Sequence, residues 1–306
     1  MDCDLSHARA VAVEAAEAAG DVVRARLFRH FEVHEKGDAG DVVTELDYAA
    51  EKVVVSRIQA AFPGHRVISE EMGGVDGTAD APDGGGARWT WLIDPVDGTN
   101  NVVIGLPVLA VGIALCRDGV PVVSAVHDPV SRRTWSAARG RGAWIATGDA
   151  ACHPLHTPKV EGHGRRRPLL AWIQGYAVGR DDATARAMRA LVADRAHRVL
   201  DLWAPLTCWT MLARGDIDGI VGYRIGEIDL HAGALIAIET GLHVRDFSGG
   251  PYDARLHGLG LGPGTGSGLE PPDEQSLLAG SAEMVAELAA MVPVARRTAA
   301  GTAGRT

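Results

Sequence analysis

The sequence predicts a mixed α and β protein made of two halves, on three observations. Short strands follow one another through tight turns between residues 89 and 138, which favours an antiparallel sheet. Strands and helices alternate between residues 169 and 240, which indicates a second, α/β layer. A long helix with an apolar face precedes both. We therefore expect an N-terminal half at 1–150, a C-terminal half at 151–296 and a disordered tail at 297–306.

The N-terminal half begins with a helix expected at 4–30, whose last part carries arginines that suit the negative end of the helix dipole. Residues 41–62 predict a short extended piece and then a helix, which Pro63-Gly64 stops. A strand over 66–69 leads into Glu70-Glu71, and residues 73–88 have the composition of a loop. The sheet strands are expected at 89–93, 108–116, 120–128 and 133–138.

The C-terminal half predicts three strand and helix pairs and a last helix. The strands are expected at 169–173, 197–201 and 218–222. The helices are expected at 182–193, 203–214, 230–240 and 281–292.

Composition excludes several function classes. The chain has 306 residues, of which 46% are hydrophobic and 23% charged, and its formal net charge is −9. No long Lys/Arg run marks a nucleic-acid surface, and no apolar run reaches the ~18 residues of a transmembrane helix. The four cysteines form no CxxC pair. We therefore expect a cytoplasmic protein without a nucleic-acid or membrane partner.

The segment WLIDPVDGTNN, residues 91–101, carries the main chemical signal. Pro95 cannot continue a strand ladder, and Asp97-Gly98 favours a turn, so Asp94 and Asp97 can converge at the strand's end. Two close carboxylates repel each other unless a cation neutralises them, and oxygen ligands suit Mg²⁺ or Mn²⁺. Gly98-Thr99-Asn100 offers backbone N–H groups at a helix start, which suits a phosphate group. If this segment stood alone in the sequence, an ordinary acidic turn without a functional role would be the simpler interpretation.

Other polar residues accompany this turn. Glu70-Glu71 ends another strand, and Asp229 lies where an apolar helix begins, a position at which an aspartate is by default an N-cap. The segment KGDAGDVVTELD adds Lys36, Asp41, Thr44 and Asp47. Asp47 could serve only to cap the helix that follows, and Lys36 could be a solvated hairpin charge.

Together these residues resemble the inositol monophosphatase family of Mg²⁺-dependent, lithium-sensitive sugar phosphatases. The first family signature, D-P-x-D-G-T-x-N, stands at residues 94–101. The Lys-x4-Asp-x-x-Thr-x-x-Asp element and the Glu-Glu pair also match. The second signature, W-D-x-A-x-G, is weaker here, because Ile228 and His231 replace its tryptophan and alanine. The resemblance covers residues 5–295 and implies the layered α-β-α-β-α sandwich of this superfamily.

The resemblance also implies a site. Glu70, Asp94 and the Val96 carbonyl would hold one Mg²⁺, and Asp94, Asp97 and Asp229 a second. A third ion would use Glu70 and water, Mn²⁺ could substitute, and Li⁺ would inhibit. Thr99 and Asp47 would orient and deprotonate the attacking water, and the N–H groups of Gly98 and Thr99 would hold phosphate. Lys36 and the position of Gly222 are assigned to phosphate or substrate binding, and Glu70 also to catalysis.

The implied activity is metal-dependent hydrolysis of a small phosphomonoester, of the inositol monophosphate kind, by a homodimer. Gly222 stands where inositol-phosphate members have a Glu, and Trp203 and Trp209 predict a more aromatic pocket. The alternatives are therefore a nucleotide, nucleoside, histidinol or pathway-specific sugar phosphate as substrate. A non-catalytic binding protein of the same fold is a further alternative.

Overall fold

The fold is known from a computed structural model that describes residues 3–27, 29, 31–36, 40–78, 86–157, 167–252 and 276–303, although not the side chains of 86, 87, 227, 229, 302 and 303. Its helices are α1 (Leu5–Arg24), α2 (Glu45–Ala61), α3 (Thr99–Val103), α4 (Ala183–Arg195), α5 (Pro205–Arg214), α6 (Glu227–Glu239) and α7 (Ala282–Ala303).

The strands within the described residues form three sheets. A hairpin pairs β1 (Val33–Lys36) with β2 (Asp41–Thr44). The eight-stranded sheet has the order β10-β9-β8-β7-β6-β5-β3-β4, and the five-stranded sheet the order β12-β11-β13-β15-β14. The strands of the larger sheet are β3 (His65–Ser69), β4 (Gly73–Val75), β5 (Gly86–Asp97), β6 (Ala110–Arg117), β7 (Val120–Asp128), β8 (Arg133–Ala138), β9 (Gly142–Thr147) and β10 (His153–Leu155). Those of the smaller are β11 (Leu169–Gln174), β12 (Arg198–Leu200), β13 (Gly219–Tyr223), β14 (His243–Asp246) and β15 (Leu277–Gly280).

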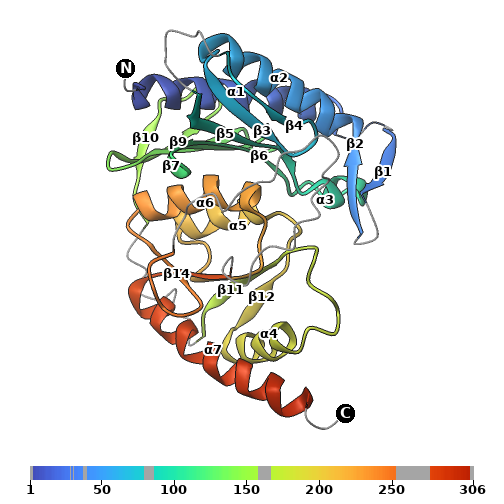
Figure 1. Cartoon of the computed structure of the whole chain (residues 1–306), viewed down its shortest axis with the longest axis vertical. Helices are drawn as coiled ribbons and strands as arrows, with labels where there is room; N and C mark the ends of the chain where they lie inside the picture. Colours follow the sequence, from blue (N-terminus) through green and yellow to red (C-terminus); the bar gives the residue numbers. More distant parts are fainter. Residues whose placement is uncertain are drawn as a thin grey trace.

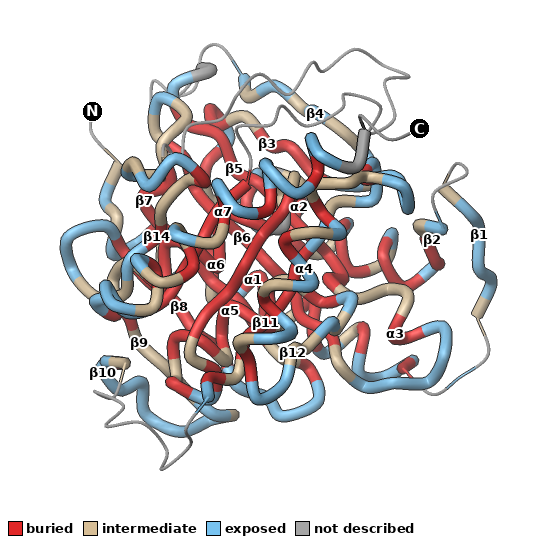
Figure 2. Tube along the Cα trace, turned by 90° about the horizontal axis from the view of Figure 1, so that it is seen from below, coloured by how far each residue is buried: buried red, intermediate tan, exposed pale blue. Residues whose placement is uncertain are grey.

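The layers follow the expected α-β-α-β-α sandwich (Figure 1). The helices α1 and α2 cover the outer face of the eight-stranded sheet, and their apolar side chains share one core with it. The helices α5 and α6 lie between the two sheets, and α4 and α7 cover the outer face of the smaller sheet. Figure 2 shows buried residues along the sheets and the helices between them, whereas β1 is largely exposed.

The N-terminal elements form for local reasons. The Asp4 side chain accepts a hydrogen bond from the Ser6 N–H and caps α1, and a row of buried alanines lets this helix lie close to the sheet. It ends at Arg24, earlier than expected, because Ala25–Leu27 form a turn that buries Leu27. The helix α2 ends before Pro63-Gly64 as predicted.

The larger sheet confirms the predicted antiparallel pairing of β5, β6, β7 and β8. The sequence did not predict β9, β10 or β4. The strand β4 pairs with β3 inside the segment expected to be loop, because Gly73 takes a positive φ of 73° and turns the chain back. Of that segment, residues 79–85 lie outside the described part.

The smaller sheet contains the predicted βα alternation, with β11 parallel to both β12 and β13. Two antiparallel strands, β14 and β15, complete it and were not expected. The disordered tail predicted after Arg296 is wrong for residues 297–303, where α7 continues to Ala303. Alanine favours helix, and Ala295 and Ala299 are buried, which carries the helix past Pro293. Residues 304–306 lie outside the described part.

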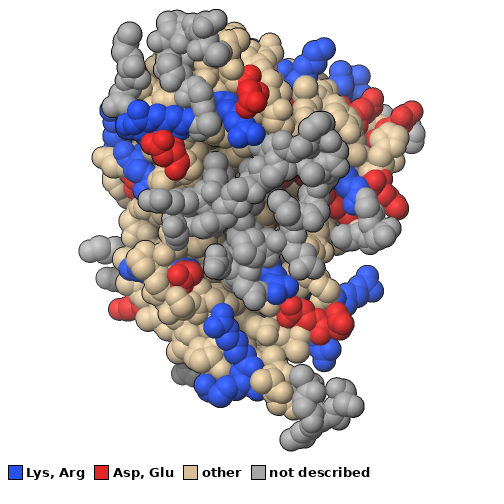
Figure 3. All heavy atoms as spheres, in the orientation of Figure 1, with Lys and Arg blue, Asp and Glu red and all other residues tan. Residues whose placement is uncertain are grey.

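No helix among the described residues is long and apolar enough to cross a membrane. On the face drawn in Figure 3, Lys and Arg side chains alternate with Asp and Glu.

Candidate active site

The candidate site is built on the end of β5. Between Asp94, opposite Gly112, and Asp97, opposite Ala110, β5 has one residue more than its partner strand, which is a β-bulge. Pro95 lies in this bulge and has no N–H to give the ladder. The Asp94 and Asp97 carboxylates are both buried, and Asp94 Oδ1 accepts a hydrogen bond from the Val96 N–H at 3.1 Å. The bulge therefore changes the direction of the strand where the two carboxylates lie.

Asp97 joins the two halves of the chain. Its Oδ2 accepts hydrogen bonds from the backbone N–H groups of Leu206, at 2.8 Å, and Thr207, at 3.3 Å. These are the first N–H groups of α5, a helix without a side-chain cap of its own. A carboxylate is stabilised at the positive end of a helix, so Asp97 caps α5 from 109 residues away.

Gly98 forms the turn that starts α3. Its φ is 95°, a backbone conformation that side chains rarely adopt. A Cβ atom at this position would lie 2.7 Å from the Val108 carbonyl oxygen. The turn therefore requires glycine on both conformational and steric grounds. It leaves α3 to begin at Thr99 with Gly98 as its N-cap.

Asp47 and Thr99 meet at this turn. The Thr99 hydroxyl lies 2.8 Å from Asp47 Oδ1 and 2.9 Å from the Val96 carbonyl oxygen, and can donate to either. The other Asp47 oxygen accepts from the backbone N–H and the hydroxyl of Thr44 and completes the capping box of α2. Asp47 is therefore a helix cap and a partner of Thr99 at once.

Glu70 lies beside the ammonium group of Lys36. The Lys36 Nζ donates to Glu70 Oε1 at 2.9 Å and also to Glu71. Lys36 is therefore paired within the acidic cluster and is not a solvated hairpin charge. The turn that bears Glu70 is held by Glu51 of α2, which is fully buried and accepts the N–H groups of Glu71 and Met72 through Oε1.

The pKa values of this cluster reflect burial and crowding of negative charge. Burial is the main cause that raises the pKa of Asp47, and the charge of Glu70 adds to it. Burial, followed by the charge of Glu70, raises the pKa of Glu71 to about 8. Burial alone would lower the pKa of Lys36, but the charges and hydrogen bonds of Glu70 and Glu71 have a larger effect, so its pKa is raised. Negative charge therefore exceeds what one ammonium group balances.

The donor chemistry of the site suits a hard divalent cation. Asp94, Asp97 and Glu70 offer carboxylate oxygens, and the crowding of Asp41, Asp47 and Glu71 beside them favours positive charge. The described residues contain no group of three His, Cys, Asp or Glu side chains arranged as metal ligands. The set expected from the sequence includes Asp229, which falls in the first turn of α6 but whose side chain lies outside the described part.

Comparison with known proteins agrees with this geometry. The sequence model of the inositol monophosphatase family matches residues 4–286. This chain belongs to the inositol monophosphatase family. Members of this family are metal-dependent phosphomonoesterases that typically use Mg²⁺.

Relatives in the family come from plants and bacteria. Inositol monophosphatase 1 of Solanum lycopersicum is 32% identical over 250 residues, which are 79% of this chain and 85% of the relative. Nus factor SuhB of Pseudomonas aeruginosa is 33% identical over 259 residues, with 78% and 85% covered. Among solved structures, Mycobacterium tuberculosis SuhB has a TM-score of 0.71 at 26% identity, with 96% of this chain and 98% of that chain covered. The suhB protein of Bartonella henselae has a TM-score of 0.73 at 23% identity, with 94% and 98% covered.

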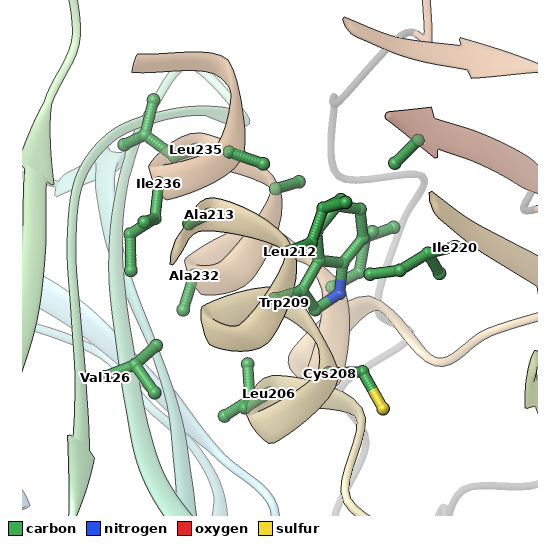
Figure 4. Close-up of a cluster of buried hydrophobic side chains, with 14 of the residues drawn as sticks. Val126, Leu206, Cys208, Trp209, Leu212, Ala213, Ile220, Ala232, Leu235 and Ile236 are labelled. Atoms are coloured by element: carbon green, nitrogen blue, oxygen red, sulfur yellow. The ribbon is translucent and has the colours of Figure 1, made fainter. Parts of the chain in front are cut away.

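Two residues expected at the pocket of this family member lie in its interior. Trp209 was expected to line the pocket, but it is fully buried and points from α5 toward Ile220 of β13 (Figure 4). Its ring fills the space that a side chain at Gly233 would need, so α5 and α6 pack closely around it. Gly222 is buried in β13, and a Cβ there would collide with Ile225, so this position presents no polar group to a substrate.

Several contacts of the site carried no signal in the sequence. Glu51 falls on the buried face of α2 and resembles any helical glutamate. Asn101 donates from Nδ2 to the Val108 and Leu202 carbonyl oxygens and connects the turn to the segment before α5. Tyr176 lies 2.9 Å through its hydroxyl from Asn100 Nδ2. Each acts through a contact distant in sequence, which spacing along the chain does not reveal.

Proposed function

We propose that this protein is a Mg²⁺-dependent phosphomonoesterase that hydrolyses a small phosphorylated metabolite. The contact between Thr99 and Asp47 beside the Gly98 turn is the observation that carries the proposal. It joins a hydroxyl at the start of α3 to a buried carboxylate with a raised pKa. A general base is more effective when its pKa approaches the working pH, so this environment suits proton abstraction.

The residues divide the work of hydrolysis. Thr99 orients a water molecule, and Asp47 accepts its proton as the water oxygen attacks phosphorus. The new P–O bond forms as the bond to the leaving alkoxide breaks, in line and without a phosphoenzyme, and the alkoxide takes a proton from solvent water. The N–H groups of Gly98 and Thr99 hold phosphate oxygens, where the start of α3 favours negative charge.

Glu70, Asp94, the Val96 carbonyl, Asp97 and Asp229 are the proposed holders of two Mg²⁺ ions, and a third would involve Glu70. When bound, the ions neutralise the phosphate dianion and stabilise the attacking and leaving oxygens. Mn²⁺ is expected to substitute and Li⁺ to inhibit. Lys36 balances part of the charge around Glu70, so we assign it to the metal cluster in place of a direct phosphate contact.

The identity of the substrate is a separate part of the proposal. Relatives named inositol monophosphatase support inositol phosphates, whereas the glycine at position 222, where inositol-phosphate members have a glutamate, favours a nucleotide, nucleoside, histidinol or pathway-specific sugar phosphate. The test is phosphate release from a panel of these esters with Mg²⁺ and with a chelator. We expect Mg²⁺-dependent turnover of at least one ester. Turnover of none of these esters would contradict the proposed phosphatase activity and favour a binding role. Because one relative is named Nus factor SuhB, the binding role would then be tested by capture of protein partners.

We also propose that the protein forms a homodimer. Val103, Ile104 and Leu106 are exposed apolar residues at the end of α3, and Ile104 is 65% exposed. A compact apolar group on the surface is typical of a protein contact. Sedimentation should give a dimer for the wild type and a monomer for Ile104→Glu, and a monomeric wild type would contradict the proposal.

A further inference from the structure

Two aromatic side chains beside the Gly98 turn are largely exposed. Tyr176 is 47% exposed and Trp203 is 56% exposed. Tyr176 follows β11, and Trp203 lies between β12 and α5, so both extend from the smaller sheet toward the end of β5. Exposed aromatic rings next to a concentration of functional groups are typical of ligand contacts.

Two neighbouring asparagines of α3 fix both aromatic segments. Asn100 Nδ2 donates to the Tyr176 hydroxyl at 2.9 Å, and Asn101 Nδ2 donates to the carbonyl of Leu202, the residue before Trp203, at 3.3 Å. The Trp203 carbonyl oxygen lies 3.3 Å from where a Cβ of Gly98 would be. Because Asn100 and Asn101 directly follow Gly98-Thr99, the segments that carry both rings belong to the immediate surroundings of the proposed phosphate site.

The backbone of Trp203 adds an independent observation. Its φ is 27°, within the left-handed region that favours glycine. A bulky residue held in that conformation is strained, and such strain concentrates at functional sites. The ring is exposed and does not join the core, so packing does not account for a tryptophan here.

The position of Gly222 offers no polar side chain to a ligand. The Ile225 side chain occupies the space over Gly222, and the turn at Arg224 packs against Gly175, the residue before Tyr176. A polyhydroxylated ring is recognised by hydrogen-bonding groups, and a site lacking them discriminates poorly in its favour. Flat unsaturated rings instead stack on aromatic faces.

We propose that Tyr176 and Trp203 are specificity-determining residues that bind a phosphate monoester whose alcohol carries a flat unsaturated ring. The inference rests on the proposed function, because the ester must place its phosphate at Gly98-Thr99. Trp203 supplies a ring face, and Tyr176 supplies a second face held in place by Asn100.

The test compares kcat/KM for benzyl phosphate and cyclohexylmethyl phosphate with Mg²⁺. Both esters release a primary alcohol of similar size, and one ring is flat and the other puckered. We expect the wild type to prefer benzyl phosphate at least ~10-fold, in line with the known strength of aromatic stacking. Trp203→Gly, which relieves the backbone strain, should lower this ratio to about 1–3. Trp203→Phe should keep most of it.

Variants of Tyr176 separate the ring from its hydroxyl. Tyr176→Phe retains the face and should keep the preference, whereas Tyr176→Leu should reduce it. A wild-type ratio near one, or a ratio unchanged in Trp203→Gly, would overturn the inference and leave the phosphatase standing. No Mg²⁺-dependent release from these esters, 4-nitrophenyl phosphate or the metabolite panel would overturn the proposed function and the inference with it.

Discussion

The Thr99 hydroxyl lies 2.8 Å from a carboxylate oxygen of Asp47, which is 52 residues earlier in the chain. The contact connects the first turn of α2 to the first residue of α3. Asp47 is also fixed by Thr44, so its orientation does not depend on Thr99 alone. The candidate base is therefore held in place by the fold.

Replacing Asp47 tests its role as base. Asp47→Asn keeps an oxygen for the Thr44 cap but cannot accept a proton, so kcat should fall by about 10²–10⁴-fold with little change in thermal stability. Glu45→Gln, an exposed carboxylate in the same helical turn, is the matched control and should keep wild-type kcat. A loss of less than tenfold in Asp47→Asn would assign the base elsewhere.

Lys36 is expected to act as a built-in counter-charge. Lys36→Met removes the cation beside Glu70 and Glu71 and should destabilise the metal-free protein by about 1–3 kcal/mol. The cost is smaller than for a fully buried ion pair because Lys36 and Glu70 are partly exposed to solvent. Added Mg²⁺ should recover more stability in the variant than in the wild type. Calorimetry with a chelator and then with Mg²⁺ measures both effects. An equal Mg²⁺ response in the two proteins would place Lys36 outside the metal cluster.

Trp209 is expected to contribute to stability and not to substrate choice. Gly233→Ala places a methyl group against its ring and should cost about 1–3 kcal/mol. In a Trp209→Ala background the same change should cost less, because Cγ and Cδ1 of Trp209, the two atoms nearest to the added methyl group, are absent. Urea unfolding of the four proteins gives the coupling, and strictly additive costs would show that the two residues do not compete for space.

These residues also show what the sequence could and could not predict. Asp94, Asp97, Gly98 and Thr99 form one local motif, and a proline and a glycine fix its turn, so short-range chemistry was sufficient. Trp209 and Trp203 are six residues apart and equally aromatic, yet one is core and the other exposed. Only the packing of α5 between the two sheets decides that difference.

The same limit applies to the elements that were missed. The antiparallel strands β14 and β15 are short and pair across a long separation, so no local alternation marks them strongly. Residues 297–303 carry an alanine-rich composition that is compatible with a tail or a helix. Burial of Ala299 selects the helix.

His127 should make stability depend on pH. It is buried beside Gly20, and its Nδ1 lies 2.9 Å from the Thr134 hydroxyl, which in turn donates a hydrogen bond to Glu17. The other charged groups that act on it are Asp21, Arg24, Asp128 and Arg132. Burial lowers its pKa from 6.5 to about 4. The unfolded chain binds the proton first as pH falls, so stability should decrease from pH 6.5 to about pH 4, by about 3 kcal/mol in total.

Above pH 6.5 His127 is neutral in both states and contributes no slope. Unfolding free energies measured from acid to neutral pH for the wild type and His127→Asn isolate its contribution, because the buried carboxylates are common to both proteins. The variant should show a shallower acid loss. Parallel curves would mean that His127 is protonated equally in the folded and unfolded chain.

The central claim is that the buried carboxylates of β5 support metal-dependent hydrolysis of a phosphomonoester. The most direct test is phosphate release by the wild type and Asp94→Asn over a series of Mg²⁺ concentrations, using the best ester of the panel. Asn retains an oxygen for the Val96 N–H, so the fold should persist.

Asp216→Asn, which removes a carboxylate paired with Arg214 on the surface, is the control. We predict Mg²⁺-dependent turnover in the wild type and the control, and a loss of at least ~10²-fold in Asp94→Asn. Wild-type turnover that persists in a chelator, or an Asp94→Asn variant as active as the control, would contradict the account.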